Sequence, residues 1–425
     1  MTPCPSPEWE VLLEPFRPLF SQPGFRYFCA FVLVFAHLDR RLWVTRVILS
    51  GLIADRHFTS FYRFLREGTW SVAAVRQQVW TLCRARCEGE GGRLFVGADD
   101  TVAPKWGKRF FGLGWHHDPM NRQHPKKLTH GHCFVCLAGL AEQTPDHFVS
   151  LFLGCALYVQ EKVCRGKRAF ATKLALAARL AGELALAPGQ VLVVVVDGGY
   201  ARQAFVQALW TPQRHVVSRL RRDTVFYDEP PPREKGQRGA PRKYGKKWKA
   251  AAWVAAEEDA WAEASLRLYG RERRVRYKTR VVLQRTLGVK IRLVAVQLGE
   301  QPVVFLFSTD TALSAVAIVR VYCARYPIET GFRNSKQEFG FSTYQVRSEA
   351  SIERVTHLCL WSQTLLQLRC WTVQPAAIYG AWRKPLAYLT LAQQKAYSRA
   401  ACGIPHRLAP DDPTLEKHEP RALAA

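Results

Sequence analysis

The run "VLVVVVDGGY", which begins at Val191, restricts the fold of this chain more than any other feature. It opens with six consecutive apolar residues and shows no alternation between polar and apolar positions. This pattern predicts a central strand that is buried on both faces of a sheet, because a strand with one solvated face would alternate. The run reaches Asp197, so we expect a carboxylate at the end of a buried strand.

Three more strands are expected before this one. The first is "RLFVGA", which begins at Arg93 and ends at Asp99 and Asp100, and "HCFVCLAGL" and "HFVSLFLGCALYV" follow it. The segment "KRAFATKLALAARLAGELAL" then predicts a helix, which a Pro-Gly pair stops. The order strand, strand, strand, helix, strand predicts an α/β fold.

The remaining segments differ in composition. Residues 1 to about 88 have long apolar stretches without a strand period and predict an all-α unit. After a short helix at 202–209 and the strand "HVVSRL", the segment "DEPPPREKGQRGAPRKYGKKWK" predicts a flexible basic loop. Residues 251–308 again predict strands. The helical pattern returns from Ser314, and the tail after about residue 375 is polar and contains prolines.

The charge of the chain indicates a polyanionic partner. Sixty-one lysines and arginines stand against 35 aspartates and glutamates, which gives a formal net charge of +26. Nucleic acid is the first candidate and an anionic membrane surface the second. The apolar run "YFCAFVLVFAHL" is much shorter than a bilayer span and predicts a buried helix instead. No secretory signal is visible, so we expect a cytoplasmic protein without a membrane partner.

The twelve cysteines occur at irregular positions, which fits a reducing compartment better than a disulfide framework. A structural zinc site usually needs two matched pairs of ligands, and no second pair follows at the matching spacing. The alternation in "HCFVCLAG" is better explained as a buried strand. The residues considered for zinc are Cys83, Cys87, Cys133, Cys136, His130 and His132.

Carboxylates at the ends of neighbouring strands are the main candidates for chemistry. Asp99 and Asp100 end one predicted strand, Asp197 ends another, and Glu329 lies on a predicted helix after the β-rich segment. Carboxylate oxygens are ligands that Mg²⁺ or Mn²⁺ prefers, and two such ions can activate a nucleophile for attack on a phosphodiester. As the alternative, each aspartate is also a common turn or cap residue.

A second pattern lies in "VYCARYPIETGFRNSK", residues 321–336. On an ideal helix Tyr322, Arg325, Glu329 and Lys336 fall at about 0°, 300°, 340° and 320°, within a sector of roughly 60°. One acid therefore lies between cations on one face. A solvated charged face is the alternative explanation.

These residues carry a resemblance to a known family. The spacing of Tyr322, Arg325, Glu329 and Lys336 resembles the Tyr-Arg-Glu-Lys signature of bacterial insertion-sequence transposases, which have an RNase H-like DDE catalytic core. "ADDT" and "VVDGGY" are similar to the first and second Asp blocks of that family. The stretch "DDTVAPKWGKRFFGLGWHHDP" resembles the subgroup of DDE superfamily endonucleases. The similarity covers roughly residues 30–370.

The resemblance implies roles for individual residues. Asp99, Asp197 and Glu329 would bind the metal, which is expected to be two ions of Mg²⁺ or Mn²⁺. Asp100 is the alternative to Asp99, because only one of two neighbours on a strand points into the site. The expected DNA-binding residues are Tyr322, Arg325 and Lys336, with Arg333, Arg242 and Lys243 as further candidates.

The implied function is a transposase that cuts double-stranded DNA at terminal inverted repeats and joins the ends to target DNA, as a homodimer in a synaptic complex and associated with the bacterial nucleoid. Two alternatives stay open, an RNase H-like nuclease without strand transfer and a catalytically inactive DNA-binding relative. Pro327 keeps the second one open, because proline interrupts a regular helix. Either the signature helix kinks there or a new helix begins at Pro327.

The expected fold class is α/β, an RNase H-like mixed sheet flanked by helices, with an N-terminal all-α domain and a β-rich insertion before the last catalytic acid. We expect five segments. They are a helical domain with a possible DNA-binding role (1–88), the first part of the catalytic core (89–220), the basic loop and β-rich insertion (221–313), the second part of the core with the signature helix (314–375), and the C-terminal tail (376–425).

Overall fold

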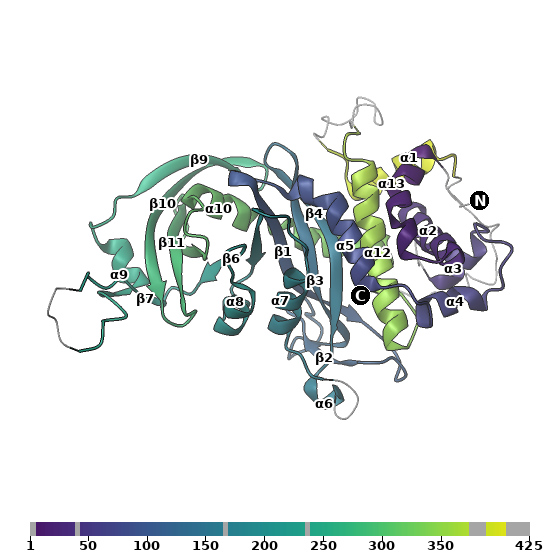
Figure 1. Ribbon diagram of the computed structural model, residues 1–425, viewed down its shortest axis with the longest axis horizontal. Coiled ribbons are helices and arrows are strands. Elements are labelled where there is room, and N and C mark those ends of the chain that lie inside the picture. The colour runs from purple at the N-terminus through teal and green to yellow at the C-terminus, as the bar shows by residue number, and fades with distance from the viewer. Residues whose placement is uncertain (1–5, 39–42, 165–168, 234–238, 374–387, 405–425) are drawn as a thin grey trace. The chain divides into compact units, whose positions relative to one another are not determined.

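The computed structural model describes residues 6–38, 43–164, 169–233, 239–373 and 388–404 (Figure 1). The chain forms two compact units. The first, Met1–Ser71 with Ser335–Ala425, is helical, and the second, Val72–Asn334, contains the sheet. We call them the helical unit and the sheet unit.

The described residues of the sheet unit form one sheet of twelve strands, ordered β2-β3-β1-β5-β6-β12-β11-β10-β7-β8, with β4 paired to β3 and β9 to β10. The strands are β1 Arg93–Pro104, β2 Gly114–His117, β3 Leu128–Thr144, β4 His147–Tyr158, β5 Val191–Val196, β6 Arg214–Leu220, β7 Val225–Tyr227, β8 Lys247–Lys249, β9 Ala262–Leu268, β10 Arg271–Gln284, β11 Val289–Leu298 and β12 Val304–Ser308. Its helices are α5 Val72–Cys83, η2 Arg84–Cys87, η3 Glu90–Gly92, α6 Glu161–Cys164, α7 Lys173–Gly182, α8 Gln203–Leu209, α9 Ala250–Ala255, α10 Ala315–Cys323 and the start of α11 Pro327–Glu338.

The strands β4, β3, β1, β5 and β6 form the expected mixed sheet. β3 is antiparallel to both β1 and β4, whereas β5 is parallel to both β1 and β6. Every residue of β5 after Val191 is fully buried, which confirms the central strand predicted from the valine run. Helices α5, α7, α8 and α10 pack on this sheet. The α/β fold class with an RNase H-like mixed sheet is therefore confirmed.

The insertion before Glu329 is β-rich, as predicted, and it continues the same sheet. β12 pairs antiparallel with β6, and β11 and β10 follow outward. Figure 1 shows β9, β10 and β11 as long curved strands, and α10 contacts β9, β11 and β12. In the part of the predicted flexible loop that the structure describes, Lys247–Lys249 is ordered as β8 because it pairs with β7.

The helical unit is built around α12 Glu349–Arg369, which is buried along most of its length. The helices around it are α1 Pro7–Leu13, η1 Glu14–Leu19, α2 Gln22–His37, α3 Val44–Leu49, α4 Thr59–Arg66 and α13 Leu391–Ala401. The apolar run near the N-terminus lies in α2 and is buried, as predicted. Within the described ranges, no helix is both long and apolar enough to span a bilayer.

Several boundaries differ from the expectation. β1 does not end at Asp99 and Asp100 but continues to Pro104, because its antiparallel pairing with β3 runs on to Pro104 opposite Gly131. α7 begins only at Lys173, where the Thr172 hydroxyl accepts the amide of Ala175 as an N-cap.

The C-terminal region also differs. The tail contains α13, which a capping box between Thr390 and Gln393 starts and which packs on α12 and α2. Residues 376–387 and 405–425 of the expected tail lie outside the described residues. α5 packs on β4 and η2 of the sheet unit, whereas the sequence grouped it with residues 1–88. The functional division into five segments stays a prediction.

None of the eleven cysteines in the described residues forms a disulfide. Cys133 and Cys136 are buried on β3, as the strand interpretation requires. The neighbouring histidines bond to backbone instead of gathering around the thiols, because His130 Nδ1 lies 3.3 Å from the carbonyl of Lys105 and His132 Nε2 lies 2.7 Å from that of Phe111.

A buried histidine makes the stability of the helical unit depend on pH. The ring of His37 lies between the carbonyl of Leu33 and the hydroxyl of Ser398, at 2.8 and 2.9 Å. The pKa of His37 is lowered to about 4, mainly by burial; the hydrogen bond with the Leu33 carbonyl opposes the fall, and the positive charges of Arg369, Lys395 and Arg399 add to it. The unfolded chain therefore binds a proton near pH 6.5 that the folded chain binds only near pH 4.

We expect the free energy of unfolding to fall as the pH is lowered from about 6.5 to 4, with His37 contributing on the order of 3 kcal/mol of the loss. Urea unfolding at a series of pH values would measure this slope for the wild type and for His37→Gln, in which all other histidines are retained. Equal slopes in the two proteins would contradict the prediction.

Candidate active site

The register of two parallel strands brings Asp99 and Asp197 to adjacent positions. The parallel pairing of β1 with β5 ends where Ala98 lies opposite Val196, and the two aspartates are the next residues on each chain. Asp99 continues along β1, whereas Asp197 begins the turn after β5. The predicted convergence of the two acids is therefore a direct consequence of strand pairing.

Pro327 divides the signature segment into two helices. α10 ends at Cys323 and α11 begins at Pro327, which is the second of the two alternatives considered for this proline. Proline suits the first turn of a helix, where its missing amide has no intrahelical acceptor. The signature residues consequently do not lie on one face of a single helix. Arg325 lies in the junction between the helices, and Glu329 lies in the first turn of α11.

Arg325 nevertheless contacts two of the predicted acids. Its Nη1 donates to Asp99 Oδ2 at 2.7 Å, and its Nη2 lies 3.3 Å from Glu329 Oε1. Burial alone would lower the pKa of Arg325, but the negative charges of Asp99, Glu329 and Asp197 and the nearby Tyr322 raise it. One guanidinium therefore lies within the electrostatic reach of all three acids.

Burial has the opposite effect on its partner. Desolvation raises the pKa of Asp99 to about 6, although the Arg325 charge and a hydrogen bond from the Asp100 amide oppose the rise. The carboxylates of Asp197 and Asp100 contribute to this rise, because like charges disfavour a second ionised group nearby. The three aspartates thus interact electrostatically.

Asp100 points to different partners from Asp99. Its Oδ2 accepts Lys173 Nζ at 2.6 Å and is 3.5 Å from Cys133 Sγ, and its Oδ1 accepts the hydroxyl of Tyr200 at 3.3 Å. Neighbouring residues of a strand point to opposite faces of the sheet. The lysine compensates the charge of Asp100, which favours Asp99 as the acid that faces Arg325.

Asp197 forms the turn that the sequence offered as the alternative to a catalytic role. Its Oδ1 accepts the amides of Gly199 at 2.9 Å and Tyr200 at 3.3 Å, so it does form the turn after β5. Its backbone carbonyl accepts the hydroxyl of Ser218 on β6 at 2.7 Å, which fixes the residue in place. The turn uses one carboxylate oxygen, and no described residue donates a hydrogen bond to the other, Oδ2.

Two glycines allow α11 to lie close to the sheet. A Cβ on Gly97 of β1 would lie 2.4 Å from Ile328 Cδ1, and a Cβ on Gly331 of α11 would lie 2.4 Å from the hydroxyl oxygen of Ser150. Ser150 in turn donates to the carbonyl of Pro327 at 3.1 Å. This close approach determines how far Glu329 stands from β1.

The other predicted residues are distributed more widely. Tyr322 is partly buried near Arg325, Arg219 and Asp197. Arg333 is exposed on α11, and Lys336 lies on the part of that helix that belongs to the helical unit. Arg242 and Lys243 are exposed between β7 and β8, and no described contact joins either to the acids.

The donor set fits a divalent cation in its chemistry, since Asp99, Asp197 and Glu329 all supply hard oxygen ligands. In the described ranges, however, no three histidine, cysteine, aspartate or glutamate side chains lie close enough together to hold a metal ion. Two of these carboxylates, those of Asp99 and Glu329, are paired with the guanidinium of Arg325.

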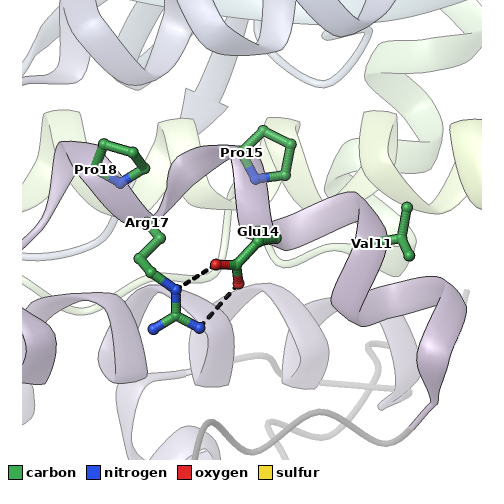
Figure 2. Close-up of a pocket in the computed structure, with 5 residues that line it drawn as sticks. All are labelled: Val11, Glu14, Pro15, Arg17 and Pro18. Carbon is green, nitrogen blue, oxygen red and sulfur yellow. Dashed lines mark hydrogen bonds and ion pairs between the residues drawn. The ribbon is translucent and has the colours of Figure 1, made fainter.

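A pocket elsewhere carries none of this chemistry. It lies over α1 and η1 and is lined by Val11, Glu14, Pro15, Arg17 and Pro18 (Figure 2). Arg17 and Glu14 bind each other through two hydrogen bonds, at 2.5 and 2.9 Å. The only charged residues in its lining therefore compensate each other.

Sequence reasoning missed two residues near the acids. Lys173, the partner of Asp100, starts a helix whose beginning the pattern did not locate. Tyr269 contacts Tyr326, next to Arg325, with ring centroids 5.8 Å apart. Its only signal in the sequence is the pair Tyr-Gly between two polar segments, which is a weak indication of a hairpin turn.

We predict that Gly331→Ala lowers the free energy of unfolding by about 1–3 kcal/mol, because the new methyl group would overlap Ser150 and Phe152. Helix propensity alone would favour alanine by up to about 1 kcal/mol. Gly182→Ala on α7 is the matched control, since a Cβ there meets nothing within 4 Å, and it should stabilise the protein. Denaturant unfolding of both variants would measure the difference, and stabilisation by both would contradict the close packing of α11.

Comparison with known proteins relates this geometry to a family. The family model of the DDE superfamily endonucleases matches residues 44–281, which includes Asp99, Asp100 and Asp197 and ends before Arg325 and Glu329. A comparison with curated proteins finds no match. The matched region covers more than half of the chain, and it contains the two strands whose pairing brings the aspartates together. The chain therefore belongs to the family of DDE superfamily endonucleases.

Proposed function

We propose that this protein is a metal-dependent DNA transposase, which cuts DNA at the ends of an insertion sequence and joins those ends to target DNA. The family supports nuclease chemistry on DNA. The observation that carries the finer proposal is the position of Arg325, whose guanidinium contacts Asp99 and Glu329 and interacts electrostatically with Asp197. One arginine of the predicted signature thus interacts with each of the three predicted acids.

In this proposal Asp99, Asp197 and Glu329 hold two divalent ions, Mg²⁺ or Mn²⁺. When bound, such ions activate the attacking oxygen and stabilise the leaving oxygen of a phosphodiester. The protein itself supplies the acids in a fixed register, through β1 and β5, and supplies Glu329 from a helix that lies close to β1. Asp100 is bound by Lys173 and serves the structure instead.

Arg325 has two possible groups of partners in this proposal. Without DNA it neutralises Asp99 and Glu329. In a complex with DNA, a phosphate of the strand being cut would be a suitable bidentate partner for this guanidinium. Tyr322 lies beside it, and Lys336 and Arg333 follow on α11 as further phosphate contacts.

Exposed basic surfaces support a DNA path over the sheet unit. Trp106 follows the end of β1 and is 90% exposed, and Lys108 and Arg109 are exposed just after it. An exposed aromatic ring among cations is suited to stack on a base while the cations bind phosphates. Arg242 and Lys243 form a second exposed basic segment at the far edge of the sheet, beside β8.

The proposal includes a homodimer in the synaptic complex, because two ends must be cut and joined. Two other functions would use the same residues. A nuclease without strand transfer needs the acids but no target-DNA site, and an inactive DNA-binding relative needs only the basic surface. The ordered site around Arg325 favours the enzymes over the inactive relative.

A pair of neighbouring variants tests the acid assignment. In a Mg²⁺-dependent assay on DNA with the ends that flank the gene, Asp99→Asn should lower nicking by at least about a hundredfold, because an amide does not replace an anionic ligand. Asp100→Asn is the matched control and should retain nicking within about tenfold, with some loss of stability from the unpaired Lys173. The reverse order would assign the site to Asp100.

Asp197→Ala and Glu329→Ala should also abolish nicking while DNA binding is kept. Joined products from the wild type would then distinguish a transposase from a nuclease that only cuts. Binding without cutting by the wild type, with Mg²⁺ and Mn²⁺ both tried, would favour the inactive relative.

A second prediction concerns metal binding without DNA. Arg325→Gln should bind Mn²⁺ roughly threefold to tenfold more tightly than the wild type, because the guanidinium no longer competes for Asp99 and Glu329. Isothermal titration calorimetry would measure the affinities. Arg333→Gln, on the same helix but exposed, should bind Mn²⁺ with wild-type affinity. Unchanged or weaker binding by Arg325→Gln would contradict competition at these acids.

A further inference from the structure

The turn between β9 and β10 has an unexpected residue at its tip. Leu268 pairs with Arg271, so Tyr269 and Gly270 form a two-residue hairpin turn, and their φ angles are +54° and +75°. Turns of this kind favour asparagine or aspartate followed by glycine, because both central residues adopt positive φ. A bulky aromatic residue in this conformation is strained.

Contacts outside the turn account for the tyrosine. Its ring packs edge-on against Tyr326, with centroids 5.8 Å apart and an interplanar angle of 90°. Burial raises the pKa of both its hydroxyl and the Cys323 thiol, and the two groups also affect each other's pKa, so they lie close together. The edge-on arrangement of two aromatic rings is favourable. Tyr269 therefore holds two residues of another segment while it forms the hairpin turn.

That segment is the junction that carries Arg325. Cys323 is the last residue of α10 and Tyr326 immediately precedes Pro327, so the two contacts lie on both sides of Arg325. The junction has only short-range backbone hydrogen bonds of its own, such as the one from the Tyr326 amide to the carbonyl of Cys323 at 3.2 Å. Since Pro327 prevents a continuous helix here, the junction gains support from an outside contact.

From these contacts we propose that Tyr269 is a positioning residue, through which the tip of the β9–β10 hairpin holds the α10–α11 junction so that Arg325 reaches Asp99 and Glu329. The proposal rests on the proposed function for its consequence in catalysis. The hairpin itself is basic, with Arg271, Arg273 and Arg274 exposed directly after the turn. The insertion thereby connects a cationic surface to the arginine of the active site.

If Tyr269 served only the stability of the turn, replacing it should lower the melting temperature and leave Arg325 in place. Asparagine is better suited than tyrosine to this position of the turn. Tyr269→Asn should therefore keep or raise the melting temperature, while it removes both contacts to the junction. The variant therefore distinguishes a positioning role from a folding role, because it should be at least as stable as the wild type and yet have a displaced Arg325.

The experiment measures Arg325 directly. Its side chain is 15% exposed, so modification by phenylglyoxal, followed by peptide mass spectrometry, should be slow in the wild type. In Tyr269→Asn we expect modification of Arg325 to be at least threefold faster and alkylation of Cys323 to accelerate as well. Tyr269→Phe keeps the ring contact with Tyr326 and should show a smaller increase at Arg325.

Lys127→Asn is the matched control. Lys127 also has a positive φ, +47°, but lies in the loop before β3 and has no described contact with the junction. This substitution should relieve backbone strain without changing the modification of Arg325. If Arg325 is modified in Tyr269→Asn at the wild-type rate, Tyr269 does not position Arg325 and the proposal is overturned.

Nicking assays on the same variants test the consequence. We expect Tyr269→Asn to lower the turnover rate at least tenfold with DNA affinity within twofold of the wild type, and Tyr269→Phe to restore part of the rate. Wild-type turnover in Tyr269→Asn would overturn the role in catalysis. If the wild type does not nick DNA, the proposed function fails, and the modification of Arg325 still decides whether Tyr269 positions it.

Discussion

The parallel pairing of β1 with β5 is the constraint on which the site depends. It fixes Ala98 opposite Val196, and thus Asp99 next to Asp197, before any side-chain contact is considered. The pairing is stable because β5 is buried on both faces and lies between two parallel neighbours. The insertion adds strands to the other side of β6, so it extends this sheet without changing the register of its centre.

Placing acids side by side in a partly buried site is costly, and Arg325 offsets part of this cost. Its guanidinium is paired with Asp99 and Glu329, whereas Asp100 has its own cation in Lys173. The two neighbouring aspartates therefore differ in what balances their charge. An ion at Asp99 would compete with Arg325, which could pair with a phosphate instead. An ion at Asp100 would compete with Lys173, which is fixed at the start of α7.

Sequence patterns predicted what depends on local burial, and missed what depends on pairing in space. The valine run gave β5, and apolar runs located β11 and β12, because buried strands are apolar in any context. The continuation of β1 through Asp99 depends on β3, which no local pattern indicates. The choice between Asp99 and Asp100 required the positions of Arg325 and Lys173. Tyr269 was missed because its partner Tyr326 lies far along the chain, and no local pattern indicates their contact.

Pro327 changes meaning once the helices are known. In one continuous helix it would be a defect, with a cost of about 3 kcal/mol, and it would point to a decayed copy. In the structure it begins α11, where proline is favoured, and its carbonyl accepts the Ser150 hydroxyl on β4. The break that it enforces creates the junction in which Arg325 turns toward Asp99. Replacing Pro327 by a helix former would favour one continuous helix through that junction, so this proline supports the site and does not argue for its loss.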